Sequence, residues 1–409
     1  MRWFVVAYVA ALAALAGAGA LGAVLLYRGF GPDDAAEAAA EDHAYDFLTW
    51  EVEHFPRKWV YKARHLFGDR AQGDEEETLR RYFGLVTETS RLADAPDGGD
   101  RLREAERERA ALEAEVEDII EGRITDVLED QGLAMEPPLF SDLGLIFPPV
   151  DFELDAPPRV LVVSPRDRIE LERSFLLEPG LGRNEFEAIE QKAESENGAE
   201  TGVSAVVVGT GGVATYPAVV SSSSAYEHLV DTAFHEWTHQ YLVFFPLGRS
   251  YFASSDLRTL NETAANLAGA ALAGVYFERY PRLEPAASPA PTASPAASPA
   301  RSFDFTASMR ALRQEVEGML GSGQVAEAEA LMERRRVEFA AEGYFIRKLN
   351  QAYFAFHGSY ADTPGSIDPI GPRMQALLEK AGSPGAFVKL AAGVTSRAEL
   401  DQLLAEAEG

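Results

Sequence analysis

The segment 234–240, which reads FHEWTHQ, constrains this chain more than any other part of its sequence. Its two histidines, His235 and His239, stand four residues apart, so on an α-helix they share a face and can both bind one metal ion. Glu236 projects beside them, where it can take a proton from a water on that metal. The residues around the motif are uncharged, as a buried helix requires. The segment therefore predicts a helix that holds zinc.

A third zinc ligand is expected, because hydrolytic zinc sites usually take three protein ligands and keep a fourth position for water. The chain has no cysteine, and the best candidate lies in the segment 259–266, which reads TLNETAAN. Here the chain resembles the gluzincin metallopeptidases, in which the HExxH helix is followed by a second helix with an Asn-Glu pair. The resemblance implies that Glu262 is the third ligand.

The segment between the two predicted helices indicates how they pack. Residues 246–256 contain proline, glycine and a Ser-Ser-Asp helix-start signal, so we expect the second helix to fold back antiparallel on the first.

The chain departs from the family pattern at one position. Thermolysin-like gluzincins place an aspartate four residues after the glutamate, where it holds a ligand histidine. This chain has Asn266 there. An amide can still accept from an imidazole N–H, but it raises the basicity of that ligand less.

Hydrolysis of a peptide bond also needs a donor that stabilises the oxyanion. Gluzincins supply it from a tyrosine, a histidine or both, downstream of the glutamate ligand. The candidates here are Tyr360, which follows a Gly-Ser break expected to form a loop, and His357. The segment 350–360, together with the two metal motifs, also resembles a family of bacterial predicted aminopeptidases. In the competing interpretation, His357 caps a helix and Tyr360 is half-buried packing.

The first residues of the chain predict a membrane segment. Residues 4–26 are uncharged and mostly apolar, which is long enough to cross a hydrocarbon layer of about 30 Å as a helix. A cleaved signal peptide is the rival interpretation. Arg2 before the run, and Arg28 with acidic residues after it, favour a body outside the cytoplasm. The predicted location is the cell membrane, as a single-pass protein with a periplasmic or extracellular catalytic domain.

The remaining pattern predicts an α+β fold in three parts: an anchor or signal peptide over 1–28, a helical stalk and hairpin over 29–150, and a zinc metallopeptidase-like domain over 151–409. Helices are expected at 75–92 and 101–131, and strands at 160–163, 169–177 and 203–208 form a small mixed sheet. Residues 211–217 are either an edge strand that pairs with substrate or an ordinary hairpin. Residues 285–300 are almost entirely Pro, Ala and Ser, and predict a disordered insertion.

Together these features predict a membrane-anchored, zinc-dependent peptidase. His235, His239 and Glu262 would hold the ion, with Glu236 as general base and Tyr360 or His357 as oxyanion donor. The net charge of −28 argues against nucleic acid as a partner, so a peptide or protein substrate is expected, with the oligomeric state left open. Aminopeptidase and endopeptidase activity are both possible. The alternative function is a non-catalytic membrane-anchored scaffold with a structural zinc site.

Overall fold

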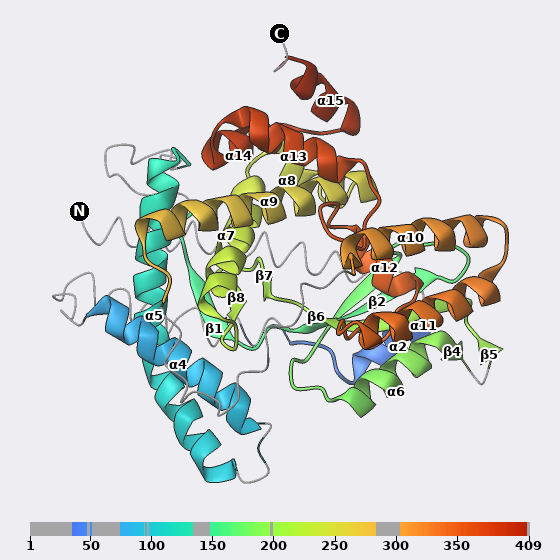
Figure 1. Cartoon of the computed structure of the whole chain (residues 1–409), viewed down its shortest axis with the longest axis horizontal. Coiled ribbons are helices and arrows are strands. Elements are labelled where there is room, and N and C mark those ends of the chain that lie inside the picture. The colour runs from blue at the N-terminus through green and yellow to red at the C-terminus, as the bar shows by residue number, and fades with distance from the viewer. Residues whose placement is uncertain are drawn as a thin grey trace.

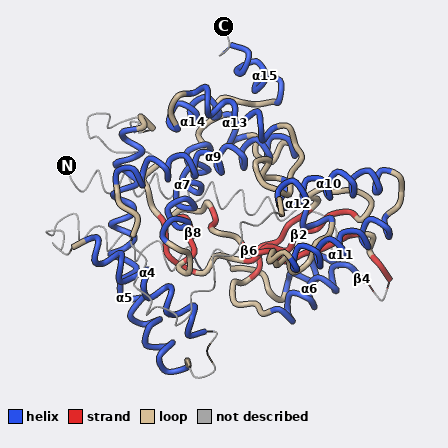
Figure 2. Tube along the Cα trace, in the orientation of Figure 1, coloured by secondary structure: helices blue, strands red, loops and turns tan. Residues whose placement is uncertain are grey.

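The computed structural model describes residues 35–46, 50, 74–93, 95, 98–133, 148–196, 199–283 and 303–406. The fold of these residues is α+β, with helices surrounding small sheets (Figure 1 and Figure 2). The predicted Pro/Ala/Ser insertion at 285–300 lies outside the described residues.

The prediction that the fold includes a transmembrane helix was wrong for the residues that the structure describes. None of the described helices is both long enough and apolar enough to cross a membrane. The longest of them are α5 (Gly99–Asp130), which carries charged side chains along its length, and α9 (Ser255–Arg279), which carries them in its first eight residues and at its end. Residues 4–26, on which the prediction was based, lie outside the described residues. The predicted location as a single-pass protein of the cell membrane therefore has no support from the structure.

The helical hairpin consists of α4 (Glu75–Ala93) and α5, which run in opposite directions. Their ion pairs show this register, because Arg81 contacts Glu108 while Glu88 contacts Arg101. Apolar side chains of both helices, such as Tyr82, belong to the same hydrophobic core as α7 (Tyr226–Leu242) and α9. The hairpin therefore supports the central helices directly, as Figure 1 shows on the left.

Within the part of the chain that the structure describes, the longer strands form two separate three-stranded sheets, where one mixed sheet was predicted. The predicted strands make an antiparallel sheet in the order β3 (Arg173–Leu177), β2 (Arg159–Pro165) and β6 (Val203–Gly209). The mixed sheet is built elsewhere, from β1 (Phe152–Asp155), β8 (Ala218–Ser221) and β7 (Gly212–Val213). In it, β1 runs parallel to β8, while β7 pairs antiparallel with β8 and lies at the edge. A short ribbon of β4 (Ser195–Glu196) and β5 (Ala199–Glu200) completes the strands.

Pairs of glutamates on neighbouring helices bind the open edges of both sheets. On α5, Glu117 and Glu121 accept the backbone N–H groups of Leu154 and Phe152 in β1. Two glutamates of α6 (Arg183–Glu194) accept N–H groups of β6 in the same way. A spacing of four residues suits this arrangement, because such side chains stand on one helix face while alternate strand N–H groups point to one side. These edges are therefore not available for pairing with another strand.

The remaining helices surround these sheets and the central pair α7 and α9. Around the β2 sheet lie α2 (Ala35–Glu41), α6, α10 (Phe305–Gly321), α11 (Val325–Ala341) and α12 (Gln351–Gly358). The short helix α8 (Pro246–Arg249) lies between α7 and α9 in the chain. Beside α9 lie α13 (Ile370–Ala381) and α14 (Pro384–Ala392), followed by α15 (Arg397–Glu406). The largest core cluster of the described residues includes apolar side chains of both α7 and α9.

Candidate metal centre

The two predicted metal-binding segments lie on α7 and α9, which pack against each other. The Ser254 side chain caps α9 by accepting from Leu257 N, as the Ser-Ser-Asp signal predicted. Gly269 allows the close contact of the helices, because a Cβ there would lie only 3.0 Å from the Asp231 carbonyl oxygen and 3.2 Å from His235 Cβ. Since Gly269 faces His235 and Asn261 faces His239, the helices run antiparallel.

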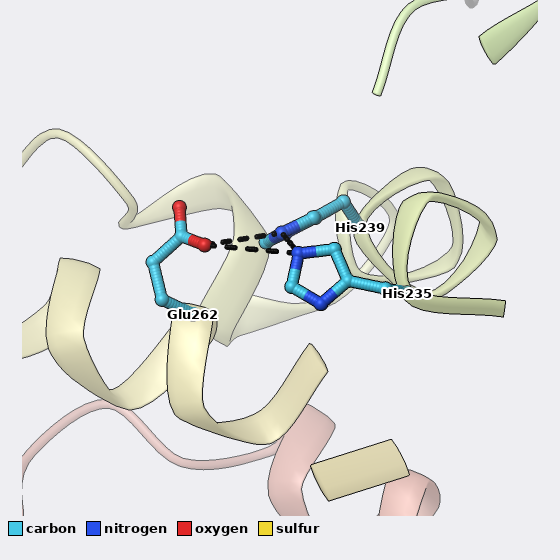
Figure 3. Close-up of side chains that lie close together, drawn as sticks. All are labelled: His235, His239 and Glu262. Carbon is cyan, nitrogen blue, oxygen red and sulfur yellow. Dashed lines mark hydrogen bonds and ion pairs between the residues drawn. The ribbon is translucent and has the colours of Figure 1, made fainter. Parts of the chain in front are cut away.

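His235, His239 and Glu262 converge on one point between these helices and could hold a metal ion (Figure 3). The two Nε2 atoms are 3.1 Å apart, and Glu262 Oε2 lies 3.4 Å from His239 Nε2 and 3.9 Å from His235 Nε2. Two ligands of a tetrahedral ion with bonds of about 2.0–2.1 Å are about 3.3 Å apart. The three separations bracket that value. The side chains are only 14%, 14% and 10% exposed.

Asn261 orients one of the histidines. Its Oδ1 lies 2.8 Å from His239 Nδ1, and because an amide oxygen only accepts, Nδ1 is the protonated nitrogen. Nε2 is then the nitrogen directed towards Glu262, and it can bind a cation once it has lost its own proton. Asn261 directly precedes Glu262, so the Asn-Glu pair contributes both a candidate ligand and a support for a second one.

The electrostatics of the metal-free site favour an ion pair. Burial lowers the pKa of His235, and His239 lowers it further, so His235 is neutral. Burial also opposes a charge on His239, but the Glu262 carboxylate outweighs it and raises the pKa of His239. Burial raises the pKa of Glu262, while the two histidines and Tyr251 lower it by more. A cation that enters the site would therefore displace a proton from His239.

Tyr251 is a contact of Glu262 that the sequence analysis did not identify. Its hydroxyl donates to Glu262 Oε1, the carboxylate oxygen that faces away from the histidines. This bond leaves Oε2 as the oxygen directed at His239 and His235. The only signal in the sequence is that Tyr251 is the one tyrosine between the two helices.

Glu236 follows His235 on α7 and is only 6% exposed. Its carboxylate is next to the backbone of β7, since a Cβ on Gly212 would lie 2.7 Å from Glu236 Oε1. Glycine at this position is what lets the strand approach the carboxylate. Burial raises the pKa of Glu236 to about 8, against the opposing effect of His239 and with a contribution from Glu262. Such a carboxyl exchanges a proton near neutral pH.

The two residues predicted as oxyanion donors occupy different surroundings. The ring of Tyr360 lies 6.3 Å from the ring of His235, centroid to centroid. His357 instead packs against Tyr353, with ring centroids 4.2 Å apart and the rings tilted by 44°, and burial lowers the pKa of His357 to about 4. Tyr360 is therefore the candidate beside the metal ligands.

Asn266 lies elsewhere than the family pattern implied. Its amide Nδ2 donates to Asp362 Oδ2 at 2.5 Å. The histidine support expected from Asn266 comes from Asn261 instead. The reason is that α9 turns the side chain of Asn266 towards the loop after Tyr360.

Comparison with protein-family models, curated proteins and solved structures finds no match for this chain. The interpretation of the site therefore depends on the arrangement of its own residues.

Proposed function

We propose that this protein is a zinc-dependent peptidase. The observation that supports it most directly is the convergence of two imidazole nitrogens and one carboxylate oxygen at tetrahedral spacing, with Glu236 buried on the same helix. Three ligands of this type leave one position for water or substrate, whereas structural zinc sites usually have four protein ligands. The gluzincin-like order of the two motifs points the same way.

The residues of the site divide the chemistry of hydrolysis among them. When bound, zinc supplies a Lewis acid that polarises the peptide carbonyl and acidifies water. Glu236 accepts the proton of the attacking water and returns it to the amide nitrogen as the C–N bond breaks. Tyr360 donates its phenol proton in a hydrogen bond to the oxyanion that forms on the former carbonyl oxygen.

The β7 edge gives a place for an extended peptide. Among the described residues, β7 pairs with a strand on one side only, and Gly212 brings its backbone beside Glu236. The opposite edge of this sheet is bound by Glu117 and Glu121. Within residues 211–217, β7 forms a hairpin with β8 and is the last strand in the order of this sheet. Main-chain pairing with β7 would hold a peptide alongside the site.

The test uses the purified full chain, assayed for bound metal and for cleavage of a mixed peptide library. Glu236→Gln should retain the metal and lose cleavage, because the amide cannot accept the proton of water. Glu227→Gln is the matched control, since Glu227 is an exposed glutamate at the start of the same helix. Cut positions would separate amino-terminal from internal attack. Metal binding without cleavage by the unaltered chain would refute the proposal in favour of a structural metal site.

A further inference from the structure

The loop that carries Tyr360 is bound to the same helix as Glu262. This loop, residues 359–369, connects α12 to α13. Immediately after the tyrosine, the backbone N–H of Ala361 donates to Thr263 Oγ1 at 3.0 Å. Thr263 is fully buried, at 0% exposed, and is the residue next to Glu262. The hydrogen bond therefore connects the backbone beside Tyr360 with the backbone beside a metal ligand.

A second bond joins the next loop residue to α9. Asp362 Oδ2 accepts from Asn266 Nδ2 at 2.5 Å. Thr263 and Asn266 are three residues apart, so both lie on one face of the helix. Two consecutive loop residues are therefore bound to two consecutive turns of α9. Two points of attachment define the direction of the loop as well as its distance from the helix.

The loop is also closed on itself around the tyrosine. Thr363 N donates to the Tyr360 carbonyl oxygen at 3.0 Å, and Thr363 Oγ1 donates to the His357 carbonyl oxygen at 2.8 Å. On its other side, a Cβ on Gly371 would lie 2.1 Å from the Ala361 carbonyl oxygen. The backbone of α13 therefore lies close against the loop at Ala361, at a distance that only glycine allows.

We propose that Thr263 and Asn266 are positioning residues that hold the phenol of Tyr360 at a set distance from the metal ligands. This inference rests on the proposed function. Its physical basis is that one rigid helix carries Glu262 and both attachment points, so Tyr360 and the metal share a common reference. It also accounts for the asparagine at 266, because an aspartate there would set a second carboxylate against that of Asp362.

The test is a kinetic comparison of Thr263→Val, Asn266→Ala and the conservative Thr263→Ser, each with and without Tyr360→Phe. Valine matches threonine in shape but cannot accept from Ala361 N. We expect Thr263→Val and Asn266→Ala each to lower kcat about tenfold with KM changed less than about twofold, because the donor is displaced while peptide binding is kept. Thr263→Ser should restore most of the loss. In the Tyr360→Phe background, the same substitutions should cost less than about twofold.

Two measurements that do not depend on activity accompany the kinetics. Metal content should be unchanged in all variants, and hydrogen exchange at the Ala361 amide should be faster in Thr263→Val than in Thr263→Ser. Full kcat in Thr263→Val and Asn266→Ala would overturn the inference. It would also be overturned if these substitutions lowered kcat by the same factor in the Tyr360→Phe background as in the unaltered chain. Loss of metal together with activity would assign Thr263 to the metal site instead. If Thr263→Val does not fold, Asn266→Ala alone decides. Absence of cleavage by the unaltered chain would refute the proposed function as well.

Discussion

Replacing Glu236 with glutamine should change how the stability of the metal-free protein depends on pH. The pKa of this carboxyl rises from an ordinary 4.5 to about 8, mainly because the side chain is buried. A group whose pKa is raised on folding contributes stability that is fully present below pH 4.5 and is lost as the pH rises to about 8. The amide of glutamine does not titrate, so the variant lacks this dependence.

The size of the effect follows from the same two pKa values. One pKa unit corresponds to about 1.4 kcal/mol, so the full difference between 4.5 and about 8 amounts to about 5 kcal/mol at most. By pH 7, about 3 kcal/mol of it should already be lost from the unaltered chain relative to the glutamine variant. The carboxyl is only 6% exposed, so solvent screening reduces this value little.

The assay is urea unfolding of both forms, freed of metal with a chelator, at steps between pH 5 and pH 8. The free energy of unfolding of the glutamine variant should exceed that of the unaltered chain by an amount that grows with pH. Bound zinc should shrink the difference, because a nearby cation lowers the pKa of a carboxyl. Glu227→Gln, exposed on the same helix, should show no such trend. A difference that stays constant with pH would refute the argument that Glu236 is desolvated in the fold.

Three other predictions concern the metal ligands and the oxyanion donor. Tyr251→Phe removes the hydrogen bond to Glu262 Oε1, so zinc affinity measured by chelator competition should fall about tenfold; unchanged affinity would contradict this role. Because Glu262 raises the pKa of His239, zinc binding should release a proton near neutral pH and tighten as the pH rises; calorimetry in buffers of different ionisation enthalpy measures this, and binding without proton release would be the contrary result. Tyr360→Phe should lower kcat about 100-fold with zinc retained, whereas His357→Asn should leave kcat within about twofold; the opposite order would make His357 the donor.

The local parts of the site could be predicted from the sequence. The spacing of His235 and His239 is a property of one helix, and every helix with that spacing puts both side chains on one face. The Asn-Glu pair on the following helix and its serine cap are equally local. The positions of α4 and α5 followed from the spacing of their residues, because helices depend on contacts three and four residues apart. The position of α7 followed from the histidine motif, and that of α9 from its helix-start signal together with the resemblance to gluzincins.

The strands were less predictable, since sheet membership depends on partners far away in the chain. The strand pattern of β2, β3 and β6 was readable, but the mixed sheet was formed by other residues. In that sheet, β1 pairs with β8 across more than sixty positions of sequence, as the pairing of Phe152 with Ala218 shows. No local pattern records which of two distant segments will lie side by side.

The choice among loop residues was decided by the tertiary structure alone. Tyr251 reaches Glu262, and Tyr360 rather than His357 lies beside His235, because of where their loops are held. Asn266 donates to Asp362, which is distant in sequence, instead of supporting a metal-binding histidine. The sequence by itself determined which helices carry the metal-binding groups, because helical periodicity is local. The packing of loops against those helices decided which further side chains complete the site, because that packing depends on contacts between segments that the sequence does not place together.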